Sequence, residues 1–174
     1  MAIAASDILL KFSVSAAAGN TTVGTAAGSL GDQCSTTELT DATLDNLFDD
    51  VSGAENAASD VEYRCIFVHN AHATLTLQGA TVEVLSQTSG GASIAIATDD
   101  VGNVAVGSAS AQAASVANES TAPTGVSAFG AGPLTIGDLA AGQVRAVWVK
   151  RTAANSAALN PDGAVLRVSG DTDA

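Results

Sequence analysis

The chain has 174 residues, of which 47% are hydrophobic and only 3% aromatic, and its formal net charge is −12. A chain of this length can bury a core of its own, and we predict a single domain over residues 1–174. Nucleic-acid binding depends on Lys and Arg that release condensed counterions, so 18 acidic residues against 6 basic ones argue against direct binding to DNA or RNA.

The N-terminal residues predict neither export nor a membrane span. Residues 1–14 lack a basic start followed by an uninterrupted apolar run, and Asp7 and Lys11 break their apolar pattern. We therefore expect no membrane partner. We also expect synthesis in a reducing cytosol, which favours free thiols at Cys34 and Cys65, although the two cysteines could pair.

The first predicted strand covers residues 8–15, which are apolar and β-branched. Residues 16–39 follow without any periodicity and predict a long loop or an extended arm. Long irregular segments in small domains are often functional, and this one could lie across a neighbouring subunit.

One short helix is predicted after this arm. Four apolar residues recur at the spacing of one helical face: Leu44, Leu47, Phe48 and Val51. Thr40 or Asp41 can cap the start of this helix, and Gly53 can end it.

After Gly53 the apolar pattern has a period of two, which predicts strands. The predicted strands cover residues 61–69, 73–78, 81–86, 93–97, 103–106, 134–136, 144–151 and 164–169. We expect the last two of these strands to pair with each other. Residues 107–133 contain few large apolar side chains and predict a second long loop or arm. Short strands with frequent turns indicate an all-β protein, namely an immunoglobulin-like or jelly-roll β-sandwich with one short helix and long loops or arms.

The stretch VEYRCIFVHN, residues 61–70, concentrates the residue types that a reactive site would use. Strand alternation places Cys65 between Tyr63 and Phe67 on one face, and Arg64 beside Glu62 on the other. A cysteine buried in this way has a raised pKa and is a poor nucleophile. We therefore predict a structural cysteine, and we expect Arg64 to hold a carboxylate or a backbone carbonyl of this chain or the next.

Four of the six cationic side chains lie between residues 145 and 167. Alternation puts Lys150 on one face of its strand and Arg145 and Arg151 on the other. They form either a polarised patch that contacts an acidic neighbour or a set of scattered, solvated charges. Together with Arg64, these three residues are the predicted interface residues.

No catalytic motif is present in the sequence. It contains no Gly-x-Ser-x-Gly elbow, no P-loop and no dinucleotide-binding glycine pattern. His69 and His72 lack further ligands nearby for a zinc site, and the turns at 98–103 and 160–163 lack the spacing of a calcium loop. We predict no catalytic, cofactor-binding or metal-binding residue and no enzyme activity, with an ion site between subunits left as an alternative.

A family resemblance supplies a more specific expectation. The segments EYRCIFVHN, APTGV, IGDLAAGQVRAVWVKR and DGAVLRVSGD, within residues 55–170, resemble small virion structural proteins of tailed bacteriophages and tailed archaeal viruses. The resemblance concerns the pattern of strands and turns. It implies a capsid decoration or cement protein, assembled in the host cytoplasm into the virion, that binds the major capsid protein and neighbouring copies, often as a trimer.

Two other functions fit the same sequence. One is a neck, tail or baseplate ring component of the virion, where rings of β-sandwiches are also common. The other is a binding module for host glycans, which would need exposed aromatic side chains for sugar stacking. The only tryptophan, Trp148, lies inside a strong predicted strand and is expected in the core.

Overall fold

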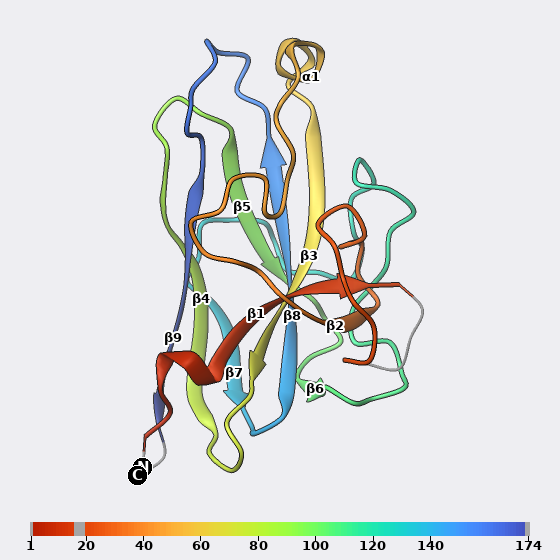
Figure 1. Cartoon of the computed structure of the whole chain (residues 1–174), viewed down its shortest axis with the longest axis vertical. Coiled ribbons are helices and arrows are strands. Elements are labelled where there is room, and N and C mark those ends of the chain that lie inside the picture. The colour runs from red at the N-terminus through yellow and green to blue at the C-terminus, as the bar shows by residue number, and fades with distance from the viewer. Residues whose placement is uncertain (1, 16–19, 173–174) are drawn as a thin grey trace.

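The protein is an all-β sandwich. In the computed structural model, which describes residues 2–15 and 20–172, nine strands form two antiparallel sheets (Figure 1). The predicted all-β class is therefore confirmed. None of the helices in these residues has the length and apolar character needed to cross a membrane.

The larger sheet contains six strands in the order β2-β1-β3-β8-β5, with β6 also paired to β8. These strands are β1 (Ile8–Val14), β2 (Gln33–Glu38), β3 (Val61–Asn70), β5 (Ser93–Thr98), β6 (Val104–Ala105) and β8 (Gln143–Thr152). The strand β8 lies in the middle, paired along one edge with β3 and along the other with β5 and β6. Its many β-branched residues suit a strand that is buried on both faces.

The smaller sheet contains three strands in the order β7-β4-β9. They are β4 (Leu77–Gln87), β7 (Leu134–Leu139) and β9 (Ala164–Thr172). The prediction that the last strand pairs with residues 144–151 is wrong, because both edges of β8 are already occupied and β9 pairs with β4 instead. The sequence predicts two strands, at 73–78 and 81–86. Residues 73–76 are irregular instead, and the rest belongs to one strand, β4, which is irregular around Gly79 at φ +55°.

The main core lies between the two sheets. It includes Ile66, Val68, Val147 and Val149 from the larger sheet and Val82 from the smaller one. These residues alternate with others that face the opposite side of the larger sheet, as strand geometry requires. The faces predicted for residues 61–69 and 144–151 are therefore confirmed.

A second core covers the other face of the larger sheet. Its buried residues are Cys34, Cys65, Phe67, Ala97, Ala113, Val144, Ala146 and Trp148. Residues 107–133 pack over this face and bond to residues 20–32, for example from Val116 N–H to the Leu30 carbonyl at 3.0 Å. The two segments together are here called the loop layer. The molecule thus has three layers, which are the small sheet, the large sheet and the loop layer, from left to right in Figure 1.

The two segments predicted as arms, residues 16–39 and 107–133, contact the rest of the domain. Within 16–39, residues 33–38 form β2, which pairs with β1, and residues 16–19 lie outside the described residues. Residues 107–133 are irregular, as predicted, but bridges from Val126 to Asp99 and from Gly130 to Ile96 hold them beside β5. The contact of these segments with a neighbouring subunit stays a prediction.

The helix is displaced from its predicted position. The structure has a helix α1 at Gly53–Ala58, which Ser52 and Glu55 cap, and a short 3-10 turn η1 at Ala5–Asp7. Residues 40–52 are irregular, with positive φ at Ala42 (53°) and Asp45 (56°). Leu47 and Phe48 pack against the main core, whereas the side chain of Leu44 is 65% exposed, so the four apolar residues do not share one helical face.

Candidate functional site

The two cysteines of the second core are structural. Cys34 and Cys65 are free thiols with no exposed surface. Burial raises the pKa of Cys34 to about 12 and raises the pKa of Cys65 well above its usual value. A thiolate is the reactive species, so neither side chain is poised as a nucleophile.

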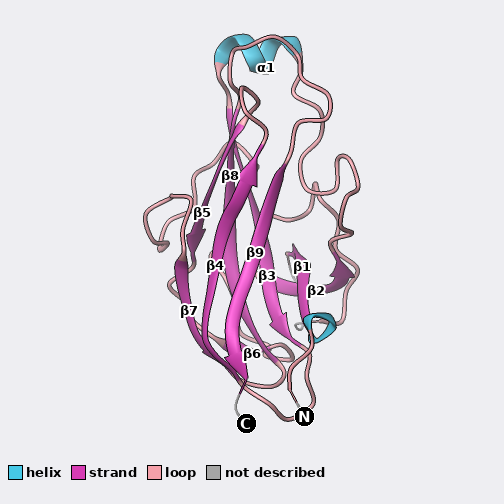
Figure 2. Cartoon of the chain, turned by 90° about the vertical axis from the view of Figure 1, so that its left-hand side faces the viewer, coloured by secondary structure: helices cyan, strands magenta, loops and turns pink. Residues whose placement is uncertain are grey.

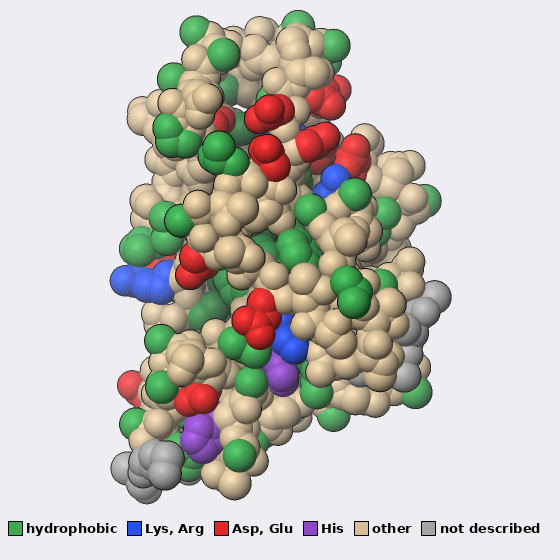
Figure 3. All heavy atoms as spheres, in the orientation of Figure 1, with side chains coloured by type: hydrophobic (Ala, Val, Ile, Leu, Met, Phe, Trp, Pro, Cys, Tyr) green, Lys and Arg blue, Asp and Glu red, His purple; other side chains and the backbone are tan. Residues whose placement is uncertain are grey.

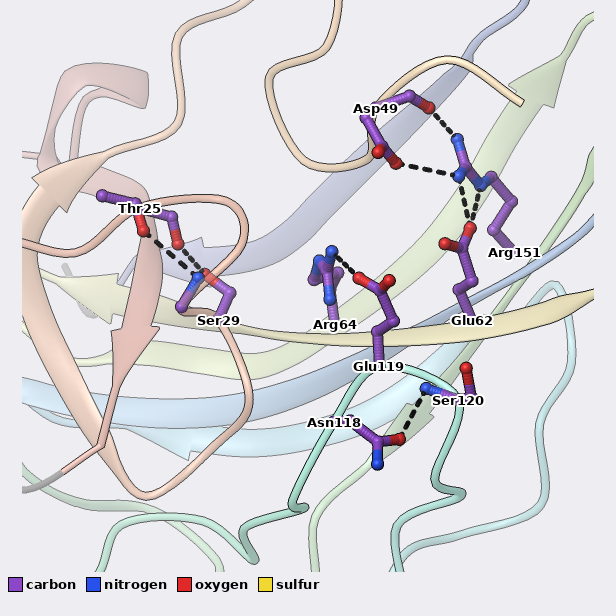
Figure 4. Close-up of polar contacts among 10 residues, drawn as sticks. Thr25, Ser29, Asp49, Glu62, Arg64, Asn118, Glu119, Ser120 and Arg151 are labelled. Carbon is purple, nitrogen blue, oxygen red and sulfur yellow. Dashed lines mark hydrogen bonds and ion pairs between the residues drawn. The ribbon is translucent and has the colours of Figure 1, made fainter. Parts of the chain in front are cut away.

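Arg64 holds a carboxylate of its own chain. Its guanidinium group is almost fully buried and donates to the carboxylate of Glu119 in the loop layer (Figure 4). A backbone hydrogen bond supports this ion pair, because the N–H of the preceding residue, Tyr63, donates to the Glu119 carbonyl at 2.7 Å. The predicted carboxylate partner is confirmed, but it is not the neighbouring Glu62.

Arg151 makes a second buried ion pair beside the first. Its Nε donates to Glu62 at 2.6 Å, and its other nitrogens contact the carbonyl and the carboxylate of Asp49, the latter at 3.3 Å. The ring of Phe48 lies 4.8 Å from the Arg151 guanidinium carbon and 5.9 Å from that of Arg64. Through these contacts, Arg64 of β3 and Arg151 of β8 hold residues 48–49 against the large sheet.

The other two predicted interface residues lie elsewhere. Lys150 sits over the ring of Phe129 at 5.6 Å on the side of the loop layer. Arg145 is half-buried, and burial lowers its pKa, although nearby Asp99 and Asp100 oppose that shift. Arg167 belongs to the small sheet and pairs with Glu83. The cations therefore form no single patch, and a partner contact at Arg145 or Lys150 stays a prediction.

Trp148 anchors the loop layer. Its indole Nε1 donates to Asp99 at 3.0 Å, and the backbone N–H groups of Ala114 and Val101 donate to the same carboxylate at 2.9 and 3.0 Å. Trp148 is fully buried, as expected, so it has no exposed face for a sugar. The role of Asp99 was missed because the sequence TDDVGN indicates a turn and not which aspartate points inward.

The two histidines have different surroundings. His69 is buried, and burial together with Lys11 lowers its pKa to about 4. His72 closes a turn instead, because its Nδ1 accepts from the N–H groups of Thr74 and Leu75 at 3.1 and 2.9 Å. Within residues 2–15 and 20–172, no group of three or more His, Cys, Asp or Glu side chains is placed to hold a metal ion.

A groove opens where the small sheet ends over the large one. Its volume is about 570 Å³, and its walls come from β1, the end of β2, and β9. The lining residues are Ala5, Ile8, Leu9, Leu10, Glu38, Leu39, Asp41, Leu77, Leu166, Val168, Ser169 and Gly170. Sequence reasoning missed this groove, because the alternation in β9 reveals an apolar face but not that β9 ends its sheet.

The surface around these features is acidic. On the face shown in Figure 3, Asp and Glu side chains gather in the upper half, with few Lys or Arg among them. The described cations Arg64, Arg151 and Arg167 are all paired with carboxylates, which leaves the excess acidic groups to set the surface potential.

Comparison with protein families, with characterised proteins and with solved structures finds no match for this chain.

Proposed function

We propose that the protein is a non-enzymatic structural protein of a virus particle, and specifically a capsid decoration protein that binds the major capsid shell and neighbouring copies. One observation carries this proposal: the reactive types of side chain in this protein, namely cysteine, arginine and aspartate, pack in the core or hold the loop layer on the large sheet. Cys65 packs in the second core, Arg64 clasps Glu119, and Asp99 anchors the loop layer through Trp148.

The three-layer construction supports the same proposal. A protein on the outside of a particle has to present a large, stable surface, and the loop layer gives this small domain a third layer without further strands. The acidic surface favours contacts with a basic or mixed protein neighbour and opposes contact with the packaged nucleic acid.

Copy number in the purified particle tests the proposal. We expect hundreds of copies per particle by quantitative mass spectrometry, since a decoration protein follows the symmetry of the shell. About three to twelve copies would instead identify a ring component of the neck, tail or baseplate, because closed rings around one axis have that size.

A binding experiment complements the count. Purified protein added to particles stripped of it is expected to rebind the shell at a saturable number of sites and to sediment with it. A protein that stays monomeric and fails to sediment with the stripped shell would contradict the proposed function.

A further inference from the structure

Apart from the two-residue β6, the two sheets end in four edge strands, and the chain itself covers three of them. Residues 20–24 lie along β2, where Thr36 N–H donates to the Thr22 carbonyl at 2.9 Å. Residues 126–130 lie along β5, and the side-chain amide of Asn103 donates to two carbonyls of β7 at 2.9 and 3.1 Å. Covering an edge in this way satisfies N–H and C=O groups that would otherwise pair with another chain.

The fourth edge, β9, is open. Among residues 2–15 and 20–172, no hydrogen bond joins the backbone of β9 to any segment other than β4. At nine residues β9 is longer than the typical strand of about 5–6 residues, so the unpaired row of N–H and C=O groups is long. The side chain of Val165 on this strand is 51% exposed.

The open edge borders an apolar floor. Leu166 and Val168 of β9 face Ile8 and Leu10 of β1 across the groove of about 570 Å³, and Leu39 closes it beyond β2. Leu166 and Val168 are only partly buried, so a segment lying in the groove would cover apolar surface that is now open to water. A strand that pairs with β9 would place every second side chain over this floor.

The rim of the groove is acidic. Glu38 and Asp41 both line it and are exposed, and neither has an ion-pair partner among the described residues. A lysine or arginine on an incoming segment would meet uncompensated negative charge at this point.

The shape of the groove selects one strand rather than a second copy of the whole sandwich. The large sheet continues past β9, because β1 and β2 lie beyond its edge (Figure 2). Two copies joined edge to edge through β9 would bring their projecting β1 and β2 strands into the same space. A single extended segment lies above β1 without this conflict.

We propose that the groove between β9 and β1 binds one extended segment of a partner protein, which adds a strand to the small sheet and alternates apolar with basic side chains. The apolar side chains cover Leu166 and Val168, and the basic ones pair with Glu38 and Asp41. Strand addition of this kind takes its affinity from main-chain hydrogen bonds and its specificity from alternate side chains. The inference rests on the open edge and does not depend on the proposed function.

A model peptide tests this inference directly. The probe is a labelled peptide of about eight residues that alternates valine with lysine, a typical strand length. We expect saturable binding by fluorescence anisotropy, and slower amide hydrogen exchange in residues 164–172 when the peptide is bound. A peptide of the same sequence that is N-methylated at alternate residues keeps its charge but cannot pair along one edge, and it should lose at least tenfold in affinity.

Charge variants of the folded protein give a matched comparison. The double variant Glu38→Gln with Asp41→Asn should weaken peptide binding about threefold to tenfold, the range expected of exposed ion pairs. Asp50→Asn with Asp60→Asn removes the same charge from two exposed residues that flank α1 in the sequence and do not line the groove, and it should change binding by less than twofold.

Four outcomes would overturn the inference. Equal binding of the N-methylated peptide would show attraction by charge alone. Protection from exchange outside residues 164–172, or no saturable binding, would remove the groove as the site. Protection of β9 that grows with protein concentration in the absence of peptide would identify a second copy as the occupant.

Discussion

Arg64 and Arg151 differ in how many carboxylates compensate each buried guanidinium group. Arg151 contacts both Glu62 and Asp49, whereas Arg64 has Glu119 as its one ion-pair partner among the described residues, and its Nε has no hydrogen-bond partner there. Removing one partner of a buried pair leaves the other charge uncompensated, which costs more than the pair itself contributes.

We therefore predict that Glu119→Gln lowers the free energy of unfolding by about 1–3 kcal/mol. The side chain of Glu119 is 41% exposed, so water compensates part of the loss and the effect stays below that of a fully buried pair. Urea unfolding followed by Trp148 fluorescence measures it. The control is Glu83→Gln, whose partner Arg167 is 51% exposed, and which should cost less than about 1 kcal/mol. Equal effects in the two variants would contradict the assignment of Glu119 as the carboxylate that compensates the buried Arg64.

His69 makes stability depend on pH. Its pKa is about 4 in the folded protein and about 6.5 when the chain is unfolded, so protons bind the unfolded chain more tightly. The stability that the neutral imidazole preserves is complete above pH 6.5 and is lost progressively as the pH falls from about 6.5 to about 4.

We predict that His69→Gln removes this part of the pH dependence. Carboxylates also titrate at low pH, so the informative quantity is the difference in free energy of unfolding between wild type and variant at pH 7 and at pH 4.5. The wild type should lose more stability than the variant between these two values. An identical loss in both proteins would mean that His69 is protonated without cost in the folded state.

At the scale of elements, the loop layer depends on close backbone contact between its two segments, residues 20–32 and residues 107–133. Gly31 has φ +96°, and a Cβ at this position would overlap the carbonyl of Ala114. This is one of the points where the two halves of the loop layer meet, because Gly31 and Ser115 also form a β-bridge.

Gly31→Ala is accordingly predicted to lower the free energy of unfolding by about 2–4 kcal/mol, through both backbone strain and the steric overlap. Gly53→Ala is the matched control, since it has ordinary φ and open space around its Cβ position, and it should be neutral or slightly stabilising. Hydrogen exchange should show faster opening of residues 107–133 in the first variant alone. Comparable stability of the two variants would refute the close contact.

The elements also show which features a sequence pattern can predict. Alternation correctly predicted which residues of β3 and β8 share a face, because successive side chains of a strand point to opposite sides of the sheet. The helix expected between the Thr40 or Asp41 cap and Gly53 did not form there, although the spacing of Leu47 and Phe48 suits one. Two positive φ angles interrupt that segment, and Asp49 and Asp50 would lie at the unfavourable end of the helix dipole.

The candidate site was less predictable than the fold. Alternation indicated that Arg64 and Glu62 share a face, but the actual partner of Arg64 is Glu119, 55 residues later in the chain. The groove depends on which strand ends the small sheet, a property of strand order that local patterns do not contain. Long-range pairing of this kind requires the folded topology.

For the whole molecule, charge is the dominant feature. With a net charge of −12 on 174 residues, mutual repulsion of carboxylates opposes the folded state. Dissolved salt screens this repulsion, since the Debye length falls from about 30 Å at 0.01 M to about 3 Å at 1 M.

We predict that Tm rises by several degrees when NaCl is raised from about 0.01 M to about 1 M. Differential scanning calorimetry measures the shift. A triple variant with Asp45→Asn, Asp50→Asn and Asp60→Asn has three fewer exposed negative charges and should respond less to the salt. A Tm that falls with added NaCl would show that attractive ion pairs outweigh the repulsion.

The position of β8 in the large sheet has a consequence for synthesis on the ribosome. The strand β8, which lies between β3 and β5 in the sheet, begins at Gln143. The ribosome therefore makes both of its neighbours long before it makes β8. Until β8 is made, β2, β1 and β3 form an incomplete sheet in which one edge of β3 is unpaired. The strand β5 then has no partner strand in the large sheet. The domain therefore folds only when nearly the whole chain has emerged, and its nascent form exposes aggregation-prone edges that the finished protein conceals.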